Sequence, residues 1–244
     1  MAEQWTGFSY IVTNLARFIR PNEITFSGVN STPPMLACLL AKRAYDWDFV
    51  YINVAGGVDP SPSSIPISSS DPLLAEGSAS IFANEDFYDL CTRGRMDLTF
   101  LGAAQLDGAG CANNSCIGEW AHPKVRLPGG GGGAVMLPTA RRACTWRTEH
   151  SKRTLVAKLD FVTSWGGMHG VVTPIAVFVK RDGKLALQSW HPESSLDEVR
   201  ERTGFTFDAS DAGPTAPPTS REREALESLD PHGQFERDAA VRLR

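Results

Sequence analysis

The sequence predicts an α/β fold with an open, mostly parallel sheet flanked by helices. Three observations support this prediction: short apolar runs typical of buried strands are followed by helical segments, glycines stand at the ends of several of these runs, and the chain of 244 residues is 42% hydrophobic. In folds of this class, ligands bind beyond the carboxyl ends of the strands. A functional site is therefore expected where the predicted strands end.

The first strand and helix are predicted between residues 23 and 41. Residues 23–28 form the strand, and the apolar residues 35–41 form the body of the helix. Thr32 is the expected N-cap of this helix, because Pro33 follows it and proline is favoured in the first helical position.

The second predicted strand, residues 49–54, runs directly into Ala55, Gly56 and Gly57. Two consecutive glycines let a ligand approach the backbone, because no Cβ atom stands in the way. This turn is the first candidate site. A loop rich in serine and proline follows over residues 59–73, and loops of this length in a compact domain are often functional.

The third strand is predicted over residues 96–101, after a helix at residues 86–93. Gly102, Ala103 and Gln105 follow the end of this strand and turn away from it. A tight turn is then predicted around residues 107–110, which contain two glycines.

Three further strands are predicted in the second half of the chain. Residues 155–162 alternate apolar and polar side chains, as strands do. Residues 174–180 and 184–190 are predicted to pair as a hairpin, because an Asp-Gly dipeptide stands between the two apolar runs.

Two helices are predicted near the C-terminus. Ser195 and Glu198 form a capping-box pattern that opens a short helix, and a second helix is predicted over residues 221–229. Residues 1–210 are expected to form one domain. Residues 211–244, rich in proline, threonine and charge, are expected to form a C-terminal tail that docks on the core or on a partner.

A run of five glycines, residues 129–133, is the second candidate site. Its amides lie on a loop that leads into a predicted helix, and such amides can hold an anion or an oxyanion. The alternative is a flexible linker, which fits poorly because charged and apolar residues stand close on both sides. The run lacks the Lys-Ser/Thr of a Walker loop, so neither ATP nor NAD is indicated.

Composition argues against several other functions. The net charge is −4 and no basic block is present, so no nucleic-acid partner is expected. No apolar run reaches the length of a membrane span and the first residues do not resemble a signal peptide, so a cytoplasmic protein without membrane contact is expected. The five cysteines and five histidines are scattered without metal-binding spacing, so reduced thiols and no metal site are expected.

Several segments, taken in order, resemble the β subunit of class I CoA transferases, and glutaconate CoA-transferase in particular. The most specific are residues 102–107, 113–118 and 122–129 with the glycine run that follows, and residues 150–153 and 158–164 continue the series. The resemblance spans most of the chain. It implies the open α/β subunit fold of that family.

The resemblance also implies a partner and a substrate. A homologous α subunit, in an α2β2 assembly, would bind an acyl-CoA with this chain at their interface, and coenzyme A would enter as part of the substrate, with no other cofactor. The CoA-binding positions it implies are Gly28, Asn30, Gly56, Gly57, Gly102, Ala103, Gln105, Gly130, Gly131, Gly132 and Gly133.

In this family a glutamate at the end of the second strand attacks the acyl-CoA, and by the resemblance that position is Ala55. A methyl group has no lone pair, so Ala55 is chemically inert as a nucleophile. The expected chemistry is therefore decarboxylation or C–C bond hydrolysis of a carboxylic or dicarboxylic acyl-CoA, with the acid and base supplied by the partner subunit. The alternatives are a true CoA transferase in which Ala55 is an engineered replacement of a glutamate or cysteine, and a non-catalytic CoA-binding subunit.

Overall fold

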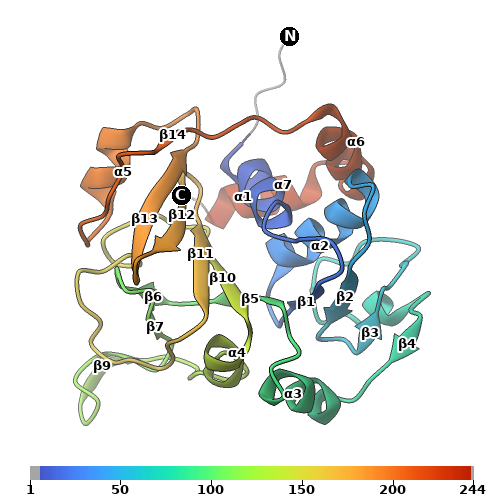
Figure 1. The fold of residues 1–244 in the computed structure, drawn as a ribbon, viewed down its shortest axis with the longest axis horizontal. Helices are drawn as coiled ribbons and strands as arrows, with labels where there is room; N and C mark the ends of the chain where they lie inside the picture. Colours follow the sequence, from blue (N-terminus) through green and yellow to red (C-terminus); the bar gives the residue numbers. More distant parts are fainter. Residues whose placement is uncertain (1–5, 243–244) are drawn as a thin grey trace.

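Five parallel strands form the centre of the main sheet (Figure 1). Their spatial order is β11 (Met168–Val172), β10 (Arg142–Trp146), β5 (Leu98–Gly102), β1 (Ile24–Ser27) and β2 (Val50–Asn53). The computed structural model describes residues 6–242, with side chains up to Asp238.

Shorter and antiparallel strands extend this sheet on both sides to ten strands. β12 (Ala176–Arg181) and β13 (Lys184–Trp190) follow β11, and β14 (Gly213–Pro214) pairs in parallel with β13 at the edge. On the other side, β3 (Gly57–Val58) and β4 (Ser80–Ile81) add antiparallel strands beyond β2. The predicted open, mostly parallel α/β fold is confirmed.

Two small antiparallel sheets lie outside the main one. β6 (Gln105–Leu106) pairs with β7 (Ala112–Asn113), and β8 (Cys116–Gly118) pairs with β9 (Pro123–Arg126).

The helices cover both faces of the sheet. α1 (Gly7–Ala16), α2 (Thr32–Ala44), α6 (Ser220–Leu229) and α7 (Gln234–Arg242) contribute to one core cluster. The second cluster contains side chains of α3 (Asn84–Thr92), α4 (Gly133–Thr139) and α5 (Leu196–Arg202). A 3₁₀ helix, η1 (Pro72–Ala75), interrupts the long serine- and proline-rich loop.

The C-terminal segment packs on the same face as α1 and α2. Leu226, Leu229 and Phe235 are buried in that core cluster. Glu222 of α6 is 2% exposed and is held by Arg17, whose Nη2 lies 2.9 Å from a carboxylate oxygen, and by the Tyr45 hydroxyl at 3.0 Å. Burial alone would raise the pKa of Glu222, but the hydrogen bonds from Arg17 and from the Thr219 amide keep it below its usual value.

The predicted strand at residues 155–162 is wrong. Only Leu155 makes a bridge, with Leu106, and Val162 is exposed. Residues 155–162 alternate in sequence but find no strand to pair with in the main sheet. The positions next to β5 and β12 are occupied by β10 and β11, two strands that were not predicted. α1 was not predicted either.

The predicted N-cap of α2 is also wrong. The helix begins at Thr32 itself and Ser31 is the N-cap residue, without a side-chain capping hydrogen bond. The Thr32 hydroxyl instead donates to the Ile67 carbonyl at 3.1 Å and ties the long loop to the helix. The predicted hairpin formed by β12 and β13 is confirmed, and so is the cap of α5, where the Glu198 amide donates to the Ser195 hydroxyl at 3.1 Å.

Candidate functional site

The carboxyl ends of the five parallel strands meet at one edge of the sheet. Gly28 and Asn30 follow β1, Ala55 follows β2, Gly102 ends β5, and Arg147 follows β10. Four of these five positions come from the sequence analysis, and Arg147 does not. This edge is the candidate functional site.

Asn53 organises the turn after β2. Its side-chain oxygen accepts hydrogen bonds from the amides of Ala55 at 3.0 Å and Gly57 at 3.4 Å, and its amide nitrogen donates to the Leu74 carbonyl at 2.9 Å. Gly56 has a φ of 97°, a conformation that favours glycine. The turn is thereby held in one shape and tied to the long loop after β3.

The turn contains no nucleophile. Val54 packs against the core cluster that includes α3, whereas Ala55 packs against the cluster on the opposite face that includes α2. Gly56, Gly57 and Val58 complete the segment. Whichever face of the strand end meets a substrate, neither side chain can form a covalent bond with it.

Gly57 has a packing role. A Cβ atom at this position would lie 2.5 Å from the Leu74 carbonyl oxygen and 2.6 Å from the Ser78 hydroxyl. The space that was expected to admit a ligand at Gly57 is therefore filled by the protein itself, and the open backbone positions lie elsewhere along the edge.

We expect Gly57→Ala to lower the free energy of unfolding by roughly 1–3 kcal/mol, because the methyl group overlaps a backbone carbonyl. Urea denaturation of the purified chain measures this. Gly102→Ala is the matched control and should stay within about 0.5 kcal/mol of the parent, since nothing lies within 4 Å of a Cβ atom there. Equal stability of the two variants would contradict the packing role of Gly57.

The glycine run leads into α4, and four of its five amides are unpaired among the described residues. The Gly129 amide donates to the Asn114 carbonyl at 2.7 Å, but within residues 6–242 the amides of Gly130, Gly131, Gly132 and Gly133 have no hydrogen-bond acceptor. Gly129 and Gly131 have positive φ angles of 96° and 48°. Adjacent unpaired amides at the start of a helix favour a negatively charged group.

α3 and the residues before it connect the glycine run to the turn after β2. A Cβ atom at Gly132 would lie 2.8 Å from the Tyr88 hydroxyl, and one at Gly56 would lie 3.1 Å from the Phe82 carbonyl. The ring of Phe87 stacks on Phe26 of β1 with a centroid separation of 3.9 Å. The two candidate sites therefore border the same aromatic cluster.

The residues after β5 have different environments. Gly102 is exposed and open, whereas Ala103 is buried and its carbonyl accepts a hydrogen bond from Arg147 at 2.8 Å. Gln105 is already engaged: its oxygen accepts from Asn113 at 2.9 Å and its nitrogen donates to the Arg153 carbonyl at 3.3 Å. Gln105 thus helps to hold the β6–β7 turn.

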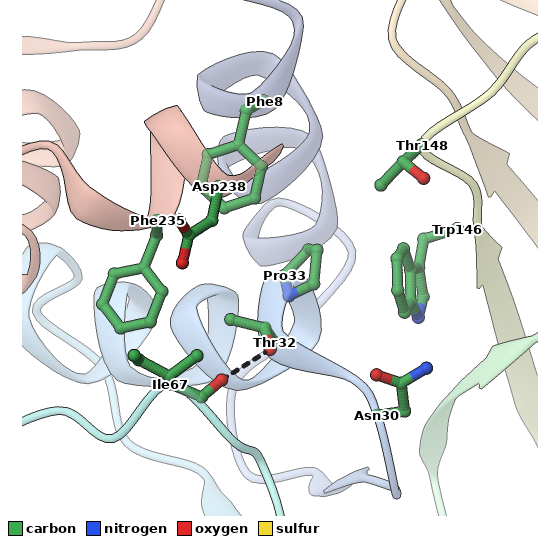
Figure 2. A pocket seen from close by; sticks show the side chains of 9 residues that line it. All are labelled: Phe8, Asn30, Thr32, Pro33, Ile67, Trp146, Thr148, Phe235 and Asp238. Carbon is green, nitrogen blue, oxygen red and sulfur yellow. Dashed lines mark hydrogen bonds between the residues drawn. The ribbon is translucent and has the colours of Figure 1, made fainter. Parts of the chain in front are cut away.

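A small pocket of about 40 Å³ opens between α1, the start of α2, β10 and α7 (Figure 2). Asn30, with a φ of 51°, lines it together with Pro33 and Ile67. Trp146 and Thr148, which also line it, were missed because β10 was not predicted. The segment Arg142–Trp146 reads Arg-Ala-Cys-Thr-Trp and has no apolar–polar alternation, so the local sequence carried little signal for this strand.

Two buried histidines lie beside a larger cleft of about 580 Å³ that Thr148 also borders. His150 bonds the hydroxyls of Thr173 and Thr203 at 2.8 and 2.9 Å, and His191 bonds the Thr215 hydroxyl and the Thr173 carbonyl at 2.9 and 3.0 Å. Burial lowers the pKa of His150 to about 3 and that of His191 to about 4. Both rings are therefore neutral and structural at neutral pH.

The thiols and metal-binding groups are distributed as follows. Cys38, Cys91, Cys116 and Cys144 are buried and Cys111 is partly exposed, all unbridged. In the part of the chain that the structure covers, no three His, Cys, Asp or Glu side chains are grouped to hold a metal ion. None of the helices there has the length and hydrophobicity needed to cross a bilayer.

The sequence profile of the coenzyme A transferase family matches residues 9–202. The chain belongs to this family. It is 32% identical to the B subunit of 3-oxoadipate CoA-transferase from Pseudomonas knackmussii, over 90% of this chain and 93% of that one, and 28% identical to the B subunit of glutaconate CoA-transferase from Acidaminococcus fermentans, over 95% of each.

Solved structures of the family superimpose closely on the chain. The decarboxylase AibA/AibB matches with a TM-score of 0.89 and 28% identity, over 96% of this chain and 98% of that one. Glutaconate CoA-transferase of Acidaminococcus fermentans matches with a TM-score of 0.84 and 25% identity, over 95% and 97%. The resemblance found in the sequence is thereby confirmed, and so is the family fold.

Proposed function

We propose that this coenzyme A transferase family member is the β-type subunit of a two-subunit enzyme that binds an acyl-CoA thioester and cleaves a C–C bond of its acyl group, by decarboxylation or hydrolysis, without transferring CoA. One observation carries the proposal. The turn after β2 has no nucleophilic side chain, while the amides of Gly130 to Gly133 have no acceptor among residues 6–242.

Three relatives support the subunit type and the substrate class. Both curated relatives are B subunits of CoA transferases that are named for dicarboxylic acids, 3-oxoadipate and glutaconate. The decarboxylase AibA/AibB shows that this fold also serves decarboxylation. We therefore infer a homologous α subunit as the partner, in an α2β2 assembly, and an acyl-CoA that carries a second carboxylate.

The chemistry follows from the unpaired amides. When the bond to a suitably placed carboxylate breaks, CO₂ leaves and the electron pair moves into the thioester carbonyl, so that its oxygen becomes negative. Amides already aimed at that oxygen stabilise the charge without reorganisation, and one such donor commonly contributes about 10²- to 10³-fold in rate. A proton from the partner subunit or from water then returns to carbon.

The side chain of Ala55 is small and has no nucleophilic atom. We infer that the half-buried methyl group, which is smaller than the glutamate that the family resemblance implies at this position, leaves room beside the Asn53-held turn for a water molecule. A covalent glutamyl-CoA intermediate cannot form at Val54 or Ala55, because neither side chain has a lone pair. The thioester is thus used as an electron sink and stays bonded to its acyl group.

The test uses the complex of this chain with its α subunit and a panel of CoA thioesters, including glutaconyl-CoA and 3-oxoadipyl-CoA, with and without an added acceptor acid. We expect CO₂ or a cleaved acyl fragment to be released, and mass spectrometry to find no CoA bound to the protein. CoA transfer to the acceptor with all substrate carbon retained would overturn the proposal and favour a true transferase, as the name of the 32%-identical relative suggests.

Two variants make this test sharper. Val54→Glu and Ala55→Glu place a carboxylate on opposite faces of the same strand end. Only the carboxylate that faces the thioester should form a glutamyl-CoA adduct. Adduct formation by one variant and not by the other would show that the pocket is intact and lacks only the nucleophile, whereas turnover unchanged in both would argue against this edge as the reaction site.

A further inference from the structure

Arg147 is an incompletely bonded cation at the carboxyl edge of the sheet. It follows β10 and is partly buried, and its Nη1 donates to the Ala103 carbonyl at 2.8 Å. Its Nε is buried and has no acceptor, and Nη2 has no acceptor among the described residues either. Two of the three nitrogens of this guanidinium, Nε and Nη2, are therefore without an acceptor among the described residues.

No carboxylate of the described chain forms an ion pair with Arg147. The nearby Glu149 is occupied by the Ser151 hydroxyl at 2.6 Å and by Arg153 at 3.1 Å. Burial lowers the pKa of the Arg147 guanidinium, and the charge of Glu149 offsets this only in part. Buried cations in proteins are ordinarily paired, so this environment is one that an anion would complete.

The free donors have the geometry of a carboxylate site. Nε and Nη2 lie on one edge of the planar guanidinium, and a carboxylate accepts two parallel hydrogen bonds from such an edge. The bond from Nη1 to Ala103 fixes the opposite edge. Arginine is thereby oriented before any ligand arrives.

The position of Arg147 matches the proposed reaction site. In the sheet register Trp146 is the partner of Gly102, so Arg147 lies beside the open end of β5. Three strand spacings, roughly 14 Å, separate the end of β10 from the turn after β2. One bound acyl-CoA can therefore contact both places.

We propose that Arg147 binds the free carboxylate of a dicarboxylic acyl-CoA and makes the enzyme specific for acyl groups that carry a second acid. This inference rests on the proposed function and assigns a specificity-determining residue to it. The competing occupant is a carboxylate of the partner subunit, which the experiment below separates from the substrate.

The experiment measures Kd for glutaryl-CoA and for its methyl ester with the two-subunit complex. The two ligands have the same acyl backbone and differ in the charge at the far end. We expect the wild type to prefer the acid by roughly 10- to 100-fold, the range of a hydrogen bond to a charged group. Arg147→Met should remove this preference by weakening the acid alone, and Arg147→Lys should retain part of it.

Arg181→Met is the matched control, because Arg181 is an exposed arginine on β12 that pairs with Asp211 at 2.9 Å. It should keep the wild-type preference. A wild type that binds both ligands equally overturns the role of Arg147 while the proposed function stands, and this comparison needs no variant. A second outcome also overturns the role of Arg147. If Arg147→Met weakens subunit assembly but the complex that remains still prefers glutaryl-CoA to its methyl ester as the wild type does, Arg147 belongs to the interface with the α subunit. A wild type that binds neither ligand overturns the proposed function itself.

Discussion

Gly131→Asp is expected to lower kcat/KM of the two-subunit enzyme by about 10²- to 10³-fold. Gly131 is exposed, lies within the run of unpaired amides, and has nothing within 4 Å of a Cβ atom. An aspartate there would direct a negative charge at the place where the thioester oxygen becomes negative. Two like charges about 4 Å apart cost about 4 kcal/mol at an effective dielectric constant of 20, which is comparable with the energy that one oxyanion donor supplies.

Gly131→Asn is the matched control for this substitution. Gly131 has a φ of 48°, and asparagine and aspartate both tolerate this conformation better than other side chains do. The two variants have nearly the same shape and differ in charge. Steady-state kinetics with the acyl-CoA that the enzyme decarboxylates or cleaves should show a much smaller loss of kcat/KM for Gly131→Asn than for Gly131→Asp. Equal activity of the two variants would show that the glycine run does not stabilise negative charge.

Acid is expected to destabilise the fold by about 4 kcal/mol between pH 7.5 and pH 5 through His150 and His191. Burial is the main cause of the lowered pKa of both residues, and the positive charge of Arg202 adds to it for His150. The folded-state pKa values of about 3 and about 4 lie below the unfolded value of 6.5. The unfolded chain therefore binds more protons between these values, and stability present above pH 6.5 is lost as the pH falls through that window. Each histidine contributes about 1.4 kcal/mol per pH unit, hence about 2 kcal/mol at pH 5.

Urea denaturation of the isolated chain at a series of pH values measures this loss. His150→Gln and His191→Gln should each flatten the dependence by about half, because a neutral amide does not titrate and still forms hydrogen bonds with the threonines. His122→Gln, at an exposed position, serves as the control and should leave the curve unchanged. A wild-type stability that is constant from pH 7.5 to pH 5 would refute the prediction.

The sequence located the two glycine-rich turns correctly but misjudged the environment of several residues in them. Gly56 and Gly131 have positive φ angles that favour glycine, and local composition already suggested such turns. Gly57 and Gln105 were grouped with them, yet the first is packed against Leu74 and the second is bonded to Asn113. Neighbours contributed by distant segments decide whether a position is open to a ligand, and no local pattern contains them.

The sequence by itself determined that the end of β2 carries no covalent nucleophile and which family fold the chain adopts. A segment of valine, alanine and glycines after β2 has no nucleophile in any conformation, and five consecutive glycines offer amides without side chains wherever they are placed. Only the tertiary structure decided that β10 and β11 stand at the centre of the sheet and that Trp146 and Arg147 thereby reach the edge where the other strands end. Strand pairing joins residues far apart in the chain, such as Arg142 with Leu98, so its outcome depends on long-range contacts that compete for the same hydrogen bonds.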